Sequence, residues 1–240
     1  MKKAIVTGLT GQDGSYLSEL LLEKGYNVIG MYRRSSINNF DRIHHLLKSP
    51  HLTLEECDLT DPSGINHLLS QYQPDEFYNL AAQSHVGSSF KNPSTTMEIN
   101  TLGVVNILEA IRLHSPATRF YQASTSEMYG KNYDTIKYHE PYQDEDTSFI
   151  PQSPYGIAKL ASHRLVGIYR EAYGLFGCCG ILFNHESPRR GVNFVTRKIT
   201  KYIGDLINHR TDQNLQLGNL SAKRDWGHAK DYVRAMALIS

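Results

Sequence analysis

The sequence predicts an α/β fold built on a doubly wound parallel sheet. Two observations predict this class. Strand and helix patterns alternate along most of the 240 residues, and alternation at this spacing is typical of parallel sheets that carry helices on both faces. The first strand pattern also runs directly into a glycine-rich turn, "GLTGQDG", that opens the first helix pattern. Ligands of such sheets bind at the carboxyl ends of the strands.

The N-terminal part predicts four strands and the helices between them. Residues rich in apolar and β-forming side chains mark the strands at 2–7, 27–32, 52–56 and 76–80. Leucines at helical spacing follow the glycine turn and end at Gly25. Asp61 is a helix cap with Pro62 at the first helical position, so a second helix begins there.

The remaining elements continue the alternation. We expect helices over 97–114 and 153–173, and strands over 119–124 and 177–183. Residues 131–150 are polar, acidic and without a period, which indicates an irregular surface excursion beside a cleft. The final residues, 228–240, form an amphipathic helix pattern without a terminating glycine or proline, so we expect the chain to end inside its fold.

Composition excludes several classes of partner. Lys+Arg number 25 against 24 Asp+Glu, a net charge of +1, so no global field favours nucleic acid or an anionic membrane. No apolar run is long enough for a signal peptide or a bilayer span. The three cysteines include the neighbours Cys178 and Cys179, which favours buried thiols and a cytoplasmic location. The eleven histidines lack zinc-site spacing, so we expect no metal.

Gly8, Gly11 and Gly14 predict a dinucleotide site. Glycines at this spacing, between a strand and a helix, allow a pyrophosphate to approach the free N–H groups at the positive end of the helix. The same glycines could form only a flexible turn, but their context favours a Rossmann-type nucleotide-binding domain.

The end of the second strand indicates which dinucleotide binds. Arg33, Arg34, Ser35 and Ser36 stand where a cofactor with free ribose hydroxyls would meet an acidic residue. Two guanidinium groups and two hydroxyls suit a 2′-phosphate, so NADP is favoured over NAD. The alternative is a solvated basic loop. The pair Asp58-Leu59, after the third strand, is placed to flank the adenine.

Tyr155 and Lys159 are four residues apart and share one face of the helix that Ser153 and Pro154 begin. A free tyrosine titrates near pH ~10, so a base that works near neutral pH needs its pKa lowered by about three units. We expect the Lys159 ammonium, the helix end and an oxidised nicotinamide to lower it together. Taken alone, the spacing could arise by chance.

Thr125, Ser126 and Glu127 follow the fifth strand at the edge where ligands bind. Together with the motifs above, they resemble the extended short-chain dehydrogenase/reductases that act on nucleotide sugars, and within these the GDP-mannose 4,6-dehydratase family. The most specific strings are "GQDGSYL" and "HESPRRG", and further matches span nearly the whole chain: "NLAAQSHV", "FYQASTSEMYG", "SPYGIAKL", "NFVTRKI" and "LGNLSAKRDWGHAKDYV".

The resemblance implies a hydro-lyase that converts GDP-mannose to GDP-4-keto-6-deoxy-mannose and water, in GDP-fucose biosynthesis. In this family Tyr155 would take the proton of the 4-hydroxyl, with Lys159 lowering its pKa and Thr125 bonding the same oxygen, while hydride passes to NADP. Glu127 would then remove the carbon 5 proton and help the 6-hydroxyl leave as water. Epimerases of the superfamily, which lack this elimination, typically carry small hydroxyl residues where this chain has Thr125, Ser126 and Glu127.

The resemblance also implies the binding residues. The cofactor would be lined by Gly8, Thr10, Gly11, Gln12, Asp13, Gly14, Leu80, Ala81, Ala82, Gln83, Ser84, Lys159, His185 and Arg190. The substrate would meet Ser126, Asn184, Lys198 and Arg224. An acidic residue beside a pyrophosphate is unfavourable, and an interaction with the helix N-terminus would explain Asp13. Lys198 and Arg224 could instead be solvated charges, and His185 a buried structural histidine.

The expected organisation is an NADP-binding Rossmann domain over 1–183 and a partial substrate-binding region over 184–240, interleaved with it and truncated relative to the family. Residues 33–39 resemble the loop through which family tetramers pack, so a homodimer or homotetramer is expected. Three functions stay open: the dehydratase, another NADP-dependent nucleotide-sugar epimerase or reductase, and a non-catalytic NADP-binding fragment.

Overall fold

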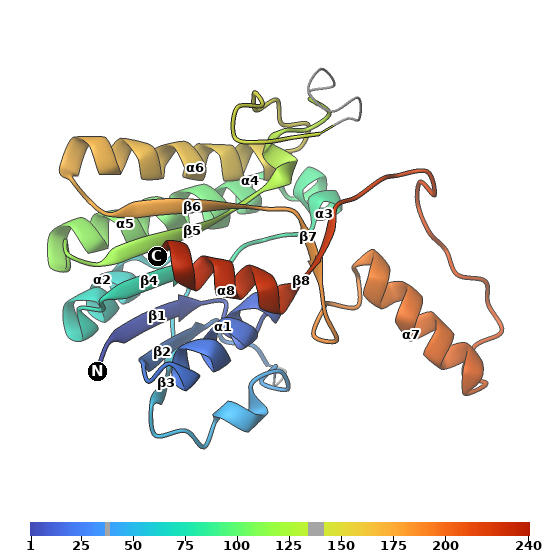
Figure 1. The fold of residues 1–240 in the computed structure, drawn as a ribbon, viewed down its shortest axis with the longest axis horizontal. Helices are drawn as coiled ribbons and strands as arrows, with labels where there is room; N and C mark the ends of the chain where they lie inside the picture. The colour runs from blue at the N-terminus through green and yellow to red at the C-terminus, as the bar shows by residue number, and fades with distance from the viewer. Residues whose placement is uncertain (37–38, 134–141) are drawn as a thin grey trace.

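The predicted parallel sheet is present. The computed structural model describes residues 1–36, 39–133 and 142–240, and six parallel strands in the order β3-β2-β1-β4-β5-β6 form its centre (Figure 1). The direction of winding reverses between β1 and β4, and such a switch point opens a crevice at the carboxyl ends of the strands. The strand bounds are Lys3–Thr7 (β1), Asn27–Tyr32 (β2), Leu52–Glu56 (β3), Glu76–Asn79 (β4), Arg119–Thr125 (β5) and Gly177–Leu182 (β6).

Helices cover both faces of the sheet. The helices are Gln12–Glu23 (α1), Pro62–Tyr72 (α2), Val86–Lys91 (α3), Pro93–Met97 (α4), Gly103–His114 (α5), Pro154–Tyr173 (α6), Val195–Ile207 (α7) and Ala229–Ile239 (α8), of which α7 does not cover the sheet. Successive strand residues point to opposite faces: Phe77 packs with α2, α5 and α6, and its neighbour Tyr78 packs with α1 and α8. Because both faces are buried, the strand sequences are continuous runs of apolar residues and do not alternate between apolar and polar residues.

The long helix predicted over 97–114 has a different form. It begins earlier, at α4, and passes through a π-helical segment, Glu98–Leu102 (η2), before α5. The wider turn accompanies a side-chain bridge: Asn100 Oδ1 accepts from the N–H of Gln83 at 2.8 Å, and its amide donates to the Gln83 carbonyl at 3.0 Å. Period alone could not distinguish this segment from an α-helix, because one added residue barely disturbs the pattern.

The C-terminal part runs away from the sheet and returns to it (Figure 1). After β7 (Asn184–Glu186), helix α7 stands apart from the main body and buries none of its residues. The chain then pairs β8 (Trp226–His228) with β7, and α8 packs beside α1. Neither short strand was predicted from the sequence. The domain boundary placed at 183 stays a prediction.

Candidate active site

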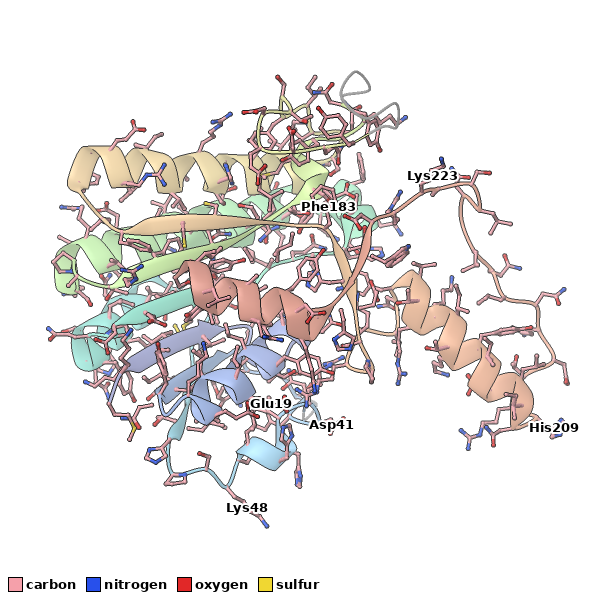
Figure 2. All side chains as sticks on the ribbon, viewed as in Figure 1. Glu19, Asp41, Lys48, Phe183, His209 and Lys223 are labelled. Atoms are coloured by element: carbon pink, nitrogen blue, oxygen red, sulfur yellow. The ribbon has the colours of Figure 1, made fainter. Side chains whose placement is uncertain are left out.

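A cleft of about 820 Å³ lies at the carboxyl ends of the central strands. Its walls come from the glycine turn, the ends of β2 to β6, and the segment after Phe183, which Figure 2 labels where β6 ends. Most of the residues predicted for the cofactor line it: Gly8, Thr10, Gly11, Gln12, Asp13, Gly14, Arg33, Ser35, Asp58, Leu59, Leu80, Ala81, Ala82, Gln83, Ser84, Lys159, His185 and Arg190. The size suits a nucleotide ligand.

The glycine turn leaves no room for side chains. Gly8 has φ +67°, and a Cβ there would lie 3.0 Å from the backbone nitrogen of Ala81. A Cβ on Gly14 would lie 2.2 Å from the Gly8 carbonyl oxygen. Gly11 caps α1 with its backbone alone, so the first N–H groups of that helix face the cleft end of β1. This is the geometry that a pyrophosphate requires.

The cleft wall after β2 holds both predicted and missed residues. Arg33 and Ser35 line it, whereas Arg34 and Ser36, although described, are not part of its wall. Arg42 was missed: its Nε donates to the Arg189 carbonyl at 2.7 Å and its terminal nitrogen to the Thr10 carbonyl at 3.1 Å. No pattern marks Arg42 in the sequence, because it follows an irregular segment and works through backbone acceptors.

Asp13 has a partner that sequence reasoning did not supply. Its carboxylate lies 2.8 Å from Nε2 of His185, whose Nδ1 lies 2.8 Å from the Phe183 carbonyl. Burial lowers the pKa of His185, but the hydrogen bond and charge of Asp13 outweigh it and the net direction is upward. Since both ring nitrogens face acceptors, the imidazolium form is favoured. Asp13 also lies in the first turn of α1, as expected, but His185 balances its charge directly.

His185 is both a cleft residue and a buried one. It is 6% exposed, lines the cleft, and stacks on the Tyr232 ring of α8 with 4.3 Å between centroids. The two interpretations left open for His185 are therefore compatible. Through Asp13 and Tyr232, His185 of β7 contacts both α1 and α8 at the wall of the cleft.

The acid and the phenol expected to react lie in the same cleft. Thr125 ends β5, and its hydroxyl accepts from the N–H of Glu127 at 3.3 Å, which starts the turn Ser126–Met128 (η3). Tyr155 lies in the first turn of α6, which Ser153 caps. A Cβ on Gly156 would lie 2.7 Å from the Glu127 carbonyl, so the two elements meet backbone to backbone. Thr125, Glu127, Tyr155 and Lys159 all line the cavity.

The pKa of Tyr155 shifts in the direction opposite to the expectation. Burial raises the pKa of Tyr155 to about 12, against a hydrogen bond from Thr125 that lowers it. The Lys159 ammonium, which was expected to lower it, donates to the Ala123 carbonyl at 2.9 Å, and burial lowers the pKa of Lys159 to about 8. The protein groups therefore raise the tyrosine pKa rather than lower it, and the contribution of an oxidised nicotinamide stays a prediction.

The predicted substrate residues divide into two groups. Ser126 and Asn184 line the cleft. Lys198 and Arg224 are exposed and lie outside the wall of this cleft as described: Lys198 donates to the Gln216 carbonyl at 2.6 Å and Arg224 to the Lys223 carbonyl at 2.7 Å. Their substrate role stays a prediction.

The cleft wall beside α3 includes residues that the sequence did not single out. His85 caps α3, with Nδ1 accepting from the N–H of Ser88 at 3.0 Å. Its ring faces Phe194, over which the Arg190 guanidinium stacks at 3.7 Å. A histidine cap has no strong sequence signature, since Ser, Thr, Asp and Asn are the usual caps.

Comparison with known proteins gives the family. The family model described as GDP-mannose 4,6 dehydratase matches residues 5–240. The chain is 52% identical over 241 residues to the GDP-mannose 4,6-dehydratase of Yersinia enterocolitica, covering 98% of this chain and 63% of that protein. The chain belongs to the GDP-mannose 4,6-dehydratase family.

Other members of the GDP-mannose 4,6-dehydratase family show the same extent of similarity. The Vibrio cholerae enzyme is 52% identical over 97% of this chain and 62% of its own length, and dehydratase 1 of Arabidopsis thaliana is 50% identical over 99% and 66%. The chain thus spans about two thirds or less of these relatives.

Solved structures confirm the fold. The dTDP-glucose 4,6-dehydratase DesIV of Streptomyces venezuelae, solved with NAD, superposes with a TM-score of 0.85 at 24% identity, over 99% of this chain and 71% of that one. A UDP-glucose 4-epimerase of Thermotoga maritima gives 0.83 at 24%, over 98% and 72%. The doubly wound, parallel Rossmann-type fold predicted from the sequence is therefore confirmed.

Two further findings concern the described residues only. None of their helices has both the length and the apolar character needed to cross a membrane. Within the same residues, His, Cys, Asp and Glu side chains form no group of three or more that could hold a metal ion.

Proposed function

We propose that this chain carries out GDP-mannose 4,6-dehydration, converting GDP-mannose to GDP-4-keto-6-deoxy-mannose and water with NADP as bound cofactor. The observation that carries the proposal is the meeting of Glu127 and Tyr155 in one cleft with a dinucleotide-type glycine turn. An epimerase needs one acid/base group on the sugar, whereas a dehydratase needs a second for the elimination. Family membership independently supports this assignment.

The residues have distinct roles in this proposal. Tyr155 takes the proton of the 4-hydroxyl, and Thr125, which hydrogen-bonds the phenol, holds the same oxygen. Once carbon 4 is a ketone, the carbon 5 proton becomes acidic and Glu127 removes it. The same carboxyl group then protonates the departing 6-hydroxyl. Asn184 and Ser126, which both line the cleft, contact the sugar, and Lys198 and Arg224 bind the diphosphate after a rearrangement of their exposed side chains.

The cleft fits the proposed cofactor. The glycine turn and the N-terminus of α1 would hold the pyrophosphate, and Arg33 with Ser35 would hold the 2′-phosphate of NADP. When bound, NADP would accept hydride from the sugar and return it after water is lost, so there is no net oxidation. The ring of His185, when protonated, would offset the negative charge of the Asp13 carboxylate near the phosphates.

The wider setting of the enzyme is also a proposal. We place it in the cytoplasm, in GDP-fucose biosynthesis, as a homodimer or homotetramer. The three free cysteines support the location, and the sequence of residues 33–39, of which 37–38 lie outside the described residues, resembles a family interface and supports the oligomer.

The test is product formation. The protein is incubated with NADP and GDP-mannose, and the 4-keto-6-deoxy product is followed by nuclear magnetic resonance. Glu127→Gln should retain exchange of the carbon 4 hydrogen with the cofactor and lose water elimination by at least about 100-fold, since general acid–base groups contribute about that much. Elimination at the native rate in this variant would refute the role of Glu127.

A second candidate is NADP binding without turnover, which is favoured by the burial that raises the pKa of Tyr155 to about 12, far from the range of a base that works near neutral pH. Tight binding of NADP with neither exchange at carbon 4 nor product would support it. Exchange at carbon 4 with epimerised product and no water loss would instead support a nucleotide-sugar epimerase.

A further inference from the structure

A line of buried polar side chains crosses the sheet beneath the cleft. Thr7, Asn79 and Gln122 occupy neighbouring positions on β1, β4 and β5, where the strand register pairs Thr7 with Asn79 and Asn79 with Gln122. Their exposed fractions are 0%, 1% and 0%. Buried amides at the centre of a parallel sheet are costly unless every polar group is paired. We therefore traced the hydrogen-bond partners of these three side chains.

The hydrogen bonds along this line can run in one direction only. The backbone N–H groups of Leu80 and Ala81 donate to the Thr7 hydroxyl oxygen at 3.0 and 2.9 Å. The single hydroxyl hydrogen of Thr7 must therefore donate onward, to Asn79 Oδ1 at 2.8 Å. The direction of the first link thus fixes which end of the Asn79 side chain is the amide oxygen.

The same logic extends to the fifth strand. The Asn79 amide nitrogen donates to Gln122 Oε1 at 2.9 Å, and Gln122 Nε2 donates to the Ala123 carbonyl at 2.9 Å. That carbonyl also accepts from Lys159 Nζ at 2.9 Å. The line thus begins at the turn predicted to border the cofactor and ends on the oxygen that holds the buried lysine.

We infer that Gln122 is a positioning residue for Lys159, acting through the carbonyl oxygen that both side chains share. Gln122 uses one lone pair of this oxygen and so limits how strongly it can hold the ammonium. The positive end of the Gln122 amide also faces the same oxygen as the ammonium and disfavours its charge. Both effects help burial to keep the pKa of Lys159 low, and they fix the place of Nζ relative to Tyr155.

Other groups near Lys159 must be separated from this effect. Cys179 on β6 would act on the pKa of Lys159 only as a thiolate, Tyr155 shares its helix, and Glu127 from η3 lines the same cleft. Burial raises the pKa of the Cys179 thiol to about 12, so the thiol stays neutral through the range where Lys159 titrates. A Cys179→Ser variant checks this directly.

The test substitutes the shared donor without changing its shape. Gln122→Glu keeps the acceptor for Asn79 but places a carboxylate where Nε2 donated to Ala123. The pKa of Lys159 is followed by the Cε shift of ¹³C-labelled lysine, assigned with Lys159→Met, a readout that needs no turnover. We expect the pKa to rise by about one unit or more, because a nearby opposite charge favours the ammonium. An unchanged pKa would overturn the inference.

Two further variants keep the result interpretable. Gln122→Met removes the donor without adding charge and should raise the pKa by less than Gln122→Glu. Should the Glu variant not fold, an unchanged pKa in Gln122→Met overturns the inference on its own. Thr118→Val is the matched control: it removes a buried hydroxyl that donates to the Pro74 carbonyl at 2.6 Å, at the opposite end of β5. A similar pKa rise in Thr118→Val would mean general loosening and would also overturn it.

The kinetic consequence rests on the proposed function. In Gln122→Met the exchange of hydrogen at carbon 4 should slow about tenfold, with the affinity for NADP within about twofold of the parent protein. Failure of the proposed function would appear as no exchange in the parent protein, whereas failure of this inference would appear as an unshifted Lys159 pKa. The two failures are therefore distinguishable.

Discussion

Replacing Gly14 by alanine should destabilise the protein although it improves helix propensity. The added Cβ would lie 2.2 Å from the Gly8 oxygen, 2.8 Å from the Gly8 carbonyl carbon and 2.9 Å from the Leu9 Cα. All three are backbone atoms, so relief requires the turn itself to move. Overpacking costs about 1–3 kcal/mol and the severity here favours the upper end, while helix propensity returns up to about 1 kcal/mol. We expect a net loss of about 2 kcal/mol.

Gly204→Ala provides a matched control. Gly204 lies inside α7, and no described atom outside its own helical neighbourhood comes within 4 Å of a Cβ built there. The same change should therefore stabilise that helix by about 0.5–1 kcal/mol. In thermal unfolding, Gly14→Ala should melt about 4–8 °C lower, and titration with NADPH should show affinity reduced at least about tenfold. Equal stabilisation by both substitutions would refute the close-approach argument.

Two further predictions concern charge in the cofactor site. Arg33→Ala should weaken NADP binding about 10–100-fold with little effect on NAD, because a charged hydrogen bond contributes about 1.5–3 kcal/mol. Arg34→Ala should weaken it less, since Arg34 is not part of the cleft wall. Equal effects of Arg33→Ala on NADP and NAD in binding titrations would contradict this prediction. The folded pKa of His185 is raised, so its stabilisation is present below the unfolded pKa and is lost as the pH rises through the folded one. Asp13→Asn should therefore lower the melting temperature more at about pH 5.5 than at about pH 9, and equal losses at both would exclude a charged pair.

The main strands and helices were predictable because their residue patterns and the residues that bound them indicate the same limits. β2 and β3 begin and end at the predicted residues, and α6 begins one residue after its predicted cap, Ser153. Each of these elements is bounded by a residue with a physical reason to stop or start, such as Gly174 in the left-handed conformation after α6. The β7 and β8 pair was missed because three-residue strands are too short to show a period.

The site residues that belong to local sequence motifs were predictable. Those whose role depends on contacts with residues distant in the sequence were not. Glycine spacing, the hydroxyl–acid run at 125–127 and the spacing of Tyr155 and Lys159 are local patterns. The pairing of Asp13 with His185 joins residues 172 positions apart, and only the return of β7 to the start of α1 brings them together. Arg42 donates hydrogen bonds to two backbone carbonyls, and because every residue has a carbonyl, the sequence does not reveal these partners.

The pKa of Tyr155 is raised where the sequence predicted that it would be lowered, and the same distinction explains why. Sequence spacing placed an ammonium one helical turn from Tyr155, and charge proximity alone would lower the pKa of the phenol. The fold buries both groups and gives Lys159 a backbone acceptor on the neighbouring strand, so desolvation exceeds attraction for the phenol. A tyrosine held this way stays protonated near neutral pH, so it can act as a base only if a cationic partner in the cleft lowers its pKa. We expect a bound oxidised nicotinamide to supply that charge, while the Ala123 carbonyl holds the Lys159 ammonium in place.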